Sequence, residues 1–181
     1  MANLYARDTA LNNVSGRSEY ISDQKRQEEI VLHEKNMKFT WQDYSNFEAN
    51  NQKSSNKNIE ARETVIALPN ELYQDKKKLK AFCDDLAKSM YGVNRDYEYA
   101  VHWNKARTNL HVHFIYSERE VNLEATPKRY KRDLWVNGKT GKTCSKNSPE
   151  AILRCQKGDI QRDSEGNIKY DNSPFTVKDK K

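Results

Sequence analysis

The chain has 181 residues, of which 35% are hydrophobic and 10% are aromatic. This length limits the protein to one domain, or one domain with an appendage, and the aromatic content argues against a wholly disordered chain. No stretch approaches the roughly 18 apolar residues of a membrane helix. No apolar segment near the N-terminus indicates a secretory signal, and three widely spaced cysteines argue against a disulfide framework. We therefore expect a cytoplasmic protein.

The formal net charge of +6 is unevenly distributed. Residues 1–120 carry 18 Lys and Arg against 18 Asp and Glu, whereas residues 121–181 carry 14 against 8. A basic appendage on a neutral body is typical of a protein that binds a polyanion, although a solvated tail has the same composition. We expect residues 1–120 to form a catalytic core and residues 121–181 to be a basic C-terminal part of the same domain.

The first 60 residues show weak periodic signals. Turn-forming residues at 12–16 predict a loop, and residues 50–58 form a polar linker. The expected elements are a strand over residues 3–7, a helix from Arg17 to about Gln27 and a short helix over residues 41–47.

The middle of the chain is better defined. Residues 63–68 form a β-branched run that ends at Pro69, which predicts a strand and a turn. Residues 75–91 predict a helix with one apolar face, formed by Leu79, Phe82, Leu86 and Met90 and followed by Gly92. Further elements are expected as strands over 97–103 and 110–117 joined by a hairpin loop, a possible helix over 149–154 and a small hairpin over 160–170. This order, β-α-β-α-β-β, predicts an α+β sheet with helices packed on it.

Three of the four histidines gather on the last two predicted strands of this region. Because side chains alternate along a strand, His111 and His113 point to one side while Val112 and Phe114 point to the other. If the strands pair through their short loop, His102 lies beside the other two histidines. Three imidazoles from two antiparallel strands leave open positions on a divalent metal ion that also binds substrate.

Ordinary roles compete with this metal site. An HxH pair on a strand can be an exposed polar pair. A third histidine, His102 on the neighbouring predicted strand, is what favours a metal site. His33 lies in a Glu-rich context and is expected at the surface, and Cys83 is expected to pack. Glu63 is the candidate carboxylate that receives a ring N–H from a ligating histidine, with a solvated charge at a strand start as its alternative.

Three segments carry a family pattern. Residues 62–72 read RETVIALPNEL, Val101-His102 is followed by NLHVH over residues 109–113, and residues 15–22 read SGRSEYIS. In these segments the chain resembles the MobA/MobL-type conjugative plasmid relaxases of the HUH endonuclease superfamily. That family usually has Pro directly before its HxH pair, where Leu110 stands here. Residues 129–180 also resemble the downstream part of the family.

The resemblance implies an α/β (α+β) fold of the HUH endonuclease type, with a ferredoxin-like central antiparallel β-sheet and helices on one or both faces. It implies site- and strand-specific nicking and strand transfer of single-stranded DNA at a plasmid or mobile-element transfer origin, through a 5′-phosphotyrosyl intermediate. It assigns His102, His111 and His113 to a divalent ion (Mn²⁺ or Mg²⁺), Glu63 to their support and Tyr20 to the nucleophile. Relaxosome and conjugation proteins are the expected partners.

The nucleophile is the least constrained of these assignments, because the chain has 10 tyrosines. The motif favours Tyr20, and Tyr5 is the reserve. Arg17 precedes Tyr20 by three residues, so it shares the same helical face and is expected to contact phosphate, with a solvated arginine as the alternative. A phosphotyrosyl ester conserves the energy of the broken bond, so a tyrosine beside a metal indicates strand transfer rather than degradation.

The basic last third is expected to close over single-stranded DNA. Cations contact phosphates while aromatic rings stack on bases, although an ordinary lysine-rich surface would have a similar composition. The predicted DNA-gripping residues are Lys128, Arg129, Tyr130, Lys131, Arg132 and Trp135.

Two other functions remain open. The same chemistry serves rolling-circle replication initiators and transposases, and a non-catalytic basic nucleic-acid-binding module would use its histidines structurally. Because the chain ends in a charged run with no closing element, we expect it to be a fragment of a longer protein.

Overall fold

The computed structural model describes residues 6–25, 29–51 and 58–178. The chain divides into two units. Unit 1 comprises Met1–Val121 with Phe175–Lys181, and unit 2 comprises Asn122–Pro174. No helix within the described ranges is long and apolar enough to cross a membrane.

Unit 1 is built on a five-stranded sheet with the order β1-β3-β5-β4-β2. All neighbouring strands are antiparallel. The strands are β1 (Ala6–Leu11), β2 (Ile30–Asn36), β3 (Ala61–Leu68), β4 (Arg95–Trp103) and β5 (Leu110–Glu120). The expected α+β class with a central antiparallel sheet is therefore confirmed.

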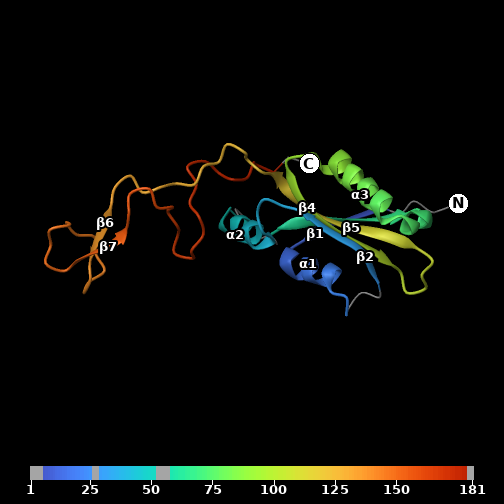
Figure 1. Ribbon diagram of the computed structural model, residues 1–181, viewed down its shortest axis with the longest axis horizontal. Helices are drawn as coiled ribbons and strands as arrows, with labels where there is room; N and C mark the ends of the chain where they lie inside the picture. Colours follow the sequence, from blue (N-terminus) through green and yellow to red (C-terminus); the bar gives the residue numbers. More distant parts are fainter. Residues whose placement is uncertain (1–5, 26–28, 52–57, 179–181) are drawn as a thin grey trace. The chain divides into compact units, whose positions relative to one another are not determined.

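Helices cover both faces of this sheet (Figure 1). On one face lie α1 (Val14–Ser22) and α2 (Trp41–Asn51). On the other lies α3 (Lys76–Tyr91), which follows a 3-10 turn at Asn70–Gln74. Since strand side chains alternate, Ile115 of β5 packs in the core beneath α1 and α2 while its neighbour Phe114 packs in the core beneath α3.

The buried face of α3 differs from the predicted one. Phe82 and Met90 are 42% and 40% exposed. The small residues at positions 83 and 87 let the helix lie close to the sheet, and the Tyr91 ring stacks on Tyr116 with centroids 4.0 Å apart. The buried side chains of α3 therefore recur every four residues, whereas the predicted apolar face began with a step of three residues from Leu79 to Phe82. The buried residues of α3 are Leu79, Cys83, Ala87 and Tyr91.

The N-terminal elements also differ from the expectation. Helix α1 begins three residues before the predicted start, because the Asn13 side chain caps it by accepting a hydrogen bond from the Gly16 N–H at 3.0 Å. Strand β2 was not predicted at all. Within the described part of the chain it pairs with β4 alone, at the edge of the sheet, and its second half is too polar to show a strand pattern. Tyr5 lies outside the described residues.

Unit 2 consists of short strand pairs. A hairpin joins β6 (Leu134–Asn137) to β7 (Ala151–Cys155), so the possible helix over residues 149–154 was wrong. The five residues of β7 alternate between half-buried and exposed as a strand does. A bridge between Arg162 and Ile168 confirms the small hairpin predicted over residues 160–170. No residue of 122–174, all of which the structure describes, is buried.

The chain returns to unit 1 at Phe175. This side chain is 5% exposed and its ring centroid lies 4.8 Å from Phe39, 4.5 Å from Tyr44 and 4.8 Å from Phe47. A bridge to Val121 brings the two ends of the excursion together. Phe175 therefore completes the core between α2 and the sheet.

We expect Phe175→Ala to lower the free energy of unfolding by about 3–5 kcal/mol, because it removes a buried aromatic ring and leaves a cavity. Urea denaturation followed by circular dichroism measures this change. Val177→Ala is the control, since Val177 is 86% exposed and should change stability by less than about 0.5 kcal/mol. Equal effects of the two substitutions would contradict the assignment of Phe175 to the core.

Candidate metal centre

Three histidine rings converge on the sheet face that carries α1 and α2. His102 of β4 pairs directly with His111 of β5, and His113 follows two residues later on the same side. The ring centroids are separated by 5.9, 5.1 and 5.0 Å. One ligand atom from each ring lies within 4.8 Å of the other two. The predicted convergence of the three rings is therefore present.

His102 is the deepest of the three, at 1% exposed. Its Nε2 lies 2.8 Å from the backbone carbonyl of Ile21 in α1. A carbonyl only accepts, so Nε2 carries the hydrogen. Its Nδ1 is buried and has no hydrogen-bond partner among the described residues. Burial and the neighbouring His113 lower the pKa of His102 to about 4, so the ring is neutral at neutral pH and Nδ1 offers a lone pair.

His113 is oriented by Glu63. The Nδ1 of His113 donates to Oε1 of Glu63 at 2.8 Å, which leaves Nε2 for a ligand. Arg17 of α1 also donates to this carboxylate, from Nε at 3.0 Å and from Nη2 at 2.7 Å. Burial raises the pKa of Glu63, but the hydrogen bonds from His113 and Arg17 outweigh it and lower the pKa. Glu63 is therefore a buried carboxylate anion that joins β3, β5 and α1.

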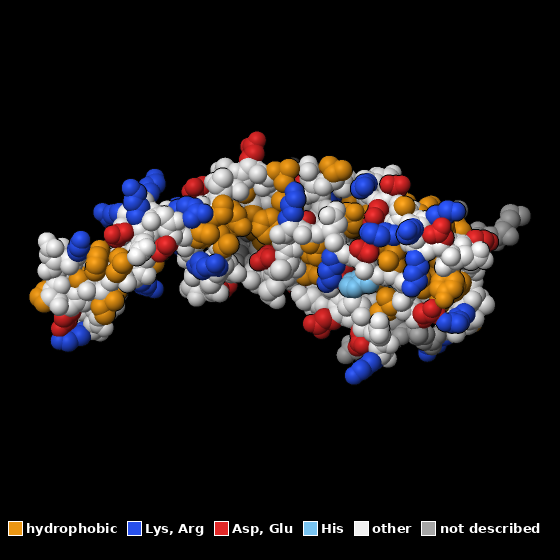
Figure 2. Space-filling model, viewed as in Figure 1, with side chains coloured by type: hydrophobic (Ala, Val, Ile, Leu, Met, Phe, Trp, Pro, Cys, Tyr) orange, Lys and Arg blue, Asp and Glu red, His pale blue; other side chains and the backbone are white. Residues whose placement is uncertain are grey.

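His111 completes the cluster at its more exposed side. Its Nδ1 lies 3.4 Å from the Asn109 carbonyl, and burial lowers its pKa. Figure 2 shows histidine atoms at the surface of unit 1. Three converging imidazoles, one of which has a buried nitrogen with no partner among the described residues, fit a divalent cation, so His102, His111 and His113 could hold one.

Helix α1 carries the candidate nucleophile next to this cluster. Tyr20 is 39% exposed, and the Arg17 guanidinium lies 4.8 Å from the centroid of its ring. The expected shared face of these two residues is therefore present. Arg17 is bound to Glu63, and its side chain is 28% exposed. Its contact with phosphate remains a prediction.

The sequence reasoning missed a second buried carboxylate on the same face. Glu98 of β4 is fully buried, and Nε2 of His33 lies 2.6 Å from its Oε1. The expectation that His33 is an ordinary surface residue was therefore wrong, since it is half-buried and paired. The signal was available in the alternation of β4, because Glu98, Ala100 and His102 share one side of the strand.

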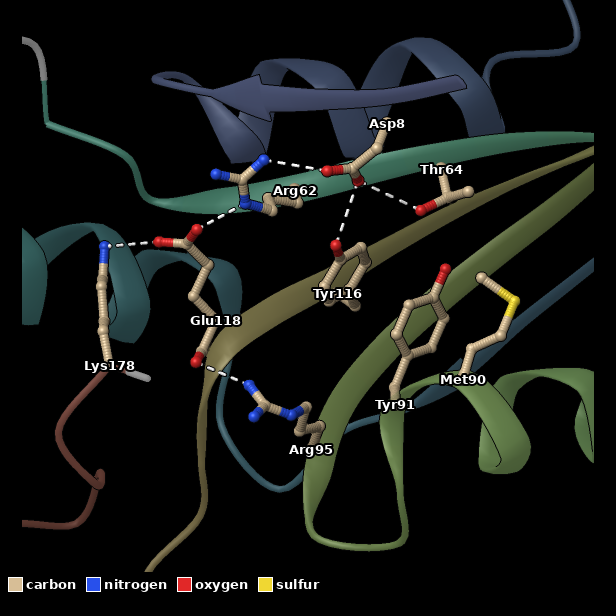
Figure 3. A pocket seen from close by; sticks show the side chains of 9 residues that line it. All are labelled: Asp8, Arg62, Thr64, Met90, Tyr91, Arg95, Tyr116, Glu118 and Lys178. Carbon is tan, nitrogen blue, oxygen red and sulfur yellow. Dashed lines mark hydrogen bonds and ion pairs between the residues drawn. The ribbon is translucent and has the colours of Figure 1, made fainter. Parts of the chain in front are cut away.

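A separate pocket of about 620 Å³ lies on the opposite face of the sheet, beside the C-terminal end of α3 (Figure 3). Within it Asp8 accepts hydrogen bonds from Tyr116 and Thr64 and pairs with Arg62. Strand alternation separates these side chains from Glu63 and the histidines. The pocket is lined by Asp8, Arg62, Thr64, Met90, Tyr91, Arg95, Tyr116, Glu118 and Lys178.

The predicted DNA-gripping residues lie in unit 2. Trp135 is half-buried on β6, with the Lys146 ammonium 5.9 Å from its ring centroid, and Arg129 donates to the Gly158 carbonyl at 2.7 Å. Their role in binding DNA remains a prediction. All six predicted residues are exposed or half-buried, namely Lys128, Arg129, Tyr130, Lys131, Arg132 and Trp135.

Comparison with known proteins gives a family match. Residues 10–174 match the model of the MobA/MobL family. The structure shows an α+β protein with a three-histidine cluster on one sheet face. It belongs to the MobA/MobL family, and the resemblance found in its motifs is confirmed at that level.

Solved structures give weaker likenesses. One, described as the molecular basis of vancomycin resistance transfer in Staphylococcus aureus, is 15% identical, covers 90% of this chain and 81% of that chain, and has a TM-score of 0.48. Another is an Mn-bound MobM relaxase domain with 22 nucleotides of plasmid pMV158 oriT DNA. It is 15% identical, covers 80% of this chain and 76% of that chain, and has a TM-score of 0.40. Curated protein sequences give no significant match.

The metal centre can be tested without DNA. We expect calorimetric titration with MnCl₂ to show one site, which His111→Ala should abolish by removing a ligand. Glu63→Gln should weaken binding by about 10–100-fold, because it disturbs the group that orients His113. His33→Gln is the control, since His33 is not part of the cluster and a glutamine amide keeps a donor for Glu98. Unchanged binding in His111→Ala would exclude the three-histidine cluster as the site.

Proposed function

We propose that this chain nicks DNA site- and strand-specifically at a transfer origin and transfers the strand, with Tyr20 as the nucleophile. The observation that carries the proposal is the attachment of α1 to the histidine cluster. Arg17 binds the carboxylate that orients His113, and the Ile21 carbonyl accepts from His102. Tyr20 stands between these two attachment points. Membership of the MobA/MobL family supports the same function.

The covalent step follows from these residues. The Tyr20 hydroxyl loses its proton as its oxygen forms a bond to phosphorus. The bond from phosphorus to the 3′ oxygen breaks, and the 3′ oxygen takes up a proton and leaves as a hydroxyl. The product is a 5′-phosphotyrosyl ester, which a 3′ hydroxyl can attack in the reverse reaction. A divalent ion bound to the three histidines would supply positive charge to the non-bridging oxygens of the scissile phosphate. Because its ligands are neutral, that charge would be undiminished by them.

Four of the other described tyrosines are less suitable nucleophiles. Burial raises the pKa of Tyr44, Tyr91 and Tyr99, which disfavours the phenolate. The Tyr116 hydroxyl lies on the opposite sheet face and donates to Asp8. Tyr20 is the described tyrosine on α1 and has the accessibility that a DNA phosphate requires.

Unit 2 is the proposed clamp on single-stranded DNA. Lys and Arg side chains stand out on it in Figure 2. No residue of 122–174 is buried, so unit 2 has no core that contact with a DNA strand would disturb. Phosphate contacts and base stacking would bury side chains that are exposed in the free protein.

The alternatives fit less well. A module with purely structural histidines leaves the buried Nδ1 of His102 without a partner, which costs free energy. Replication initiators and transposases would share the cleavage step. Family membership favours transfer of a plasmid or mobile element over these roles.

The nucleophile assignment is tested by adduct formation. Wild-type protein, a labelled single-stranded origin oligonucleotide and Mn²⁺ should give a covalent protein–DNA band on a denaturing gel, and EDTA should abolish it. Tyr20→Phe should lose the band because it lacks the attacking oxygen. Tyr73→Phe is the matched control, since Tyr73 is also 39% exposed and should keep the band. A Tyr20→Phe protein that still forms the adduct would refute the assignment.

The clamp is tested by the salt dependence of DNA binding. Replacing Lys131 and Arg132 together by alanine should weaken binding and reduce the slope of log K against log salt by about 1.4, at about 0.7 per lost phosphate contact. Fluorescence anisotropy with a labelled oligonucleotide measures both. Lys76→Ala with Lys77→Ala removes the same charge from the exposed start of α3 and should leave the slope unchanged. An unchanged slope in the unit 2 variant would mean that these cations do not contact DNA.

A further inference from the structure

Glu98 gathers donors from three elements onto one buried carboxylate. It is 0% exposed and lies on the face of β4 that also carries His102. Burial raises its pKa, but the hydrogen bonds from His33, Ser18 and Trp41 outweigh that effect and lower the pKa to about 2. A buried anion of this kind is stable only with its donors in place. These are Ser18 Oγ of α1 at 2.7 Å, Trp41 Nε1 of α2 at 2.6 Å, and His33 Nε2 and Lys35 Nζ of β2 at 2.6 and 3.1 Å.

Helix α1 is attached to the sheet through polar contacts of Arg17, Ser18 and Ile21. Arg17 binds Glu63, Ser18 binds Glu98 and the Ile21 carbonyl accepts from His102. Successive helix residues are rotated by about 100°, so Ser18 and Tyr20 flank Arg17 on opposite sides. The bond at Ser18 thus resists a roll of the helix about its axis that the bond at Arg17 alone would permit. Such a roll would move the Tyr20 ring relative to the three histidines.

We propose that Glu98 is a positioning residue, which fixes the rotation of α1 through Ser18 and so places Tyr20 against the histidine cluster. The proposal rests on the proposed function, in which Tyr20 is the nucleophile. Glu98 itself is buried and does not touch DNA. A displacement of a reacting group by about 1 Å can slow a reaction by as much as 100-fold, so a small roll of α1 is sufficient to reduce the rate.

The test compares two serines of the same helix. Ser18→Ala removes the one α1 side chain that donates to Glu98 and also the acceptor for Lys35 Nζ. Ser22→Ala removes a hydroxyl whose hydrogen bonds within the described residues go to the Ser18 and Glu19 carbonyls of α1 itself. We expect Ser18→Ala to slow single-turnover adduct formation by about tenfold or more, with the Kd values for the oligonucleotide and Mn²⁺ within about twofold of wild type. Ser22→Ala should keep the wild-type rate. A wild-type rate in Ser18→Ala, or an equal loss in both variants, would overturn the proposal.

A second pair of variants removes the carboxylates. Glu98→Gln should slow adduct formation at least as much as Ser18→Ala. Glu48→Gln is the control, because Glu48 is 4% exposed and paired with Arg119 and Lys178, outside α1. Circular dichroism checks that both variants fold. Equal rates for Glu98→Gln and Glu48→Gln would contradict a specific effect on α1.

Amide hydrogen exchange of α1 tests the positioning role of Glu98 independently of the proposed DNA-nicking function. Amides of α1 should exchange faster in Ser18→Ala than in Ser22→Ala, in the absence of DNA and metal. If wild-type protein forms no adduct, the proposed function fails, and the exchange of α1 alone decides whether Glu98 holds the helix. Unchanged exchange in Ser18→Ala would overturn the positioning role whatever the outcome with DNA.

Discussion

The buried carboxylate of Glu63 is the interaction on which the rest of the candidate site depends. Its partners come from distant parts of the chain, since Arg17 lies 46 residues before it and His113 lies 50 residues after it. Burial of a charge is expensive unless hydrogen bonds repay it, so Glu63, Arg17 and His113 require one another. One anion thus fixes the imidazole orientation and, at the same time, the position of the helix that carries Tyr20.

The apolar core beneath α3 determines which side chains of β5 point to the opposite face of the sheet. Val112 and Phe114 pack under α3, and strand alternation then turns His111 and His113 towards α1. A slip of one residue in the pairing of β5 would turn His111 and His113 towards α3 and turn Val112 and Phe114 towards α1. The free energy that holds the register therefore comes mostly from side chains that never approach the site, and the three histidines gain their alignment from it.

Local patterns predicted the elements that carry this arrangement, but not the long-range contacts. The runs at β3, β4 and β5 and the two-residue period of His111 and His113 are visible in the sequence, and so is the likeness of the family motifs. Strand β2 was missed because its second half is polar and shows no strand pattern, and His33 was misjudged because its partner Glu98 lies 65 residues away. The face of α3 was wrong because close packing against the sheet selected Cys83 and Ala87 rather than the larger Phe82 and Met90.

The two units differ in what can stabilise them. Unit 1 closes its core with Phe175, which arrives only after the chain has passed through all of unit 2. Unit 2 has exposed cations and no buried residue in 122–174, so short ladders and turns must offset the conformational entropy of ordering it. Stability that is weak in the free protein is compatible with a segment whose favourable contacts are made with a ligand. If DNA is that ligand, the basic charge serves both to attract the strand and to order the segment that holds it.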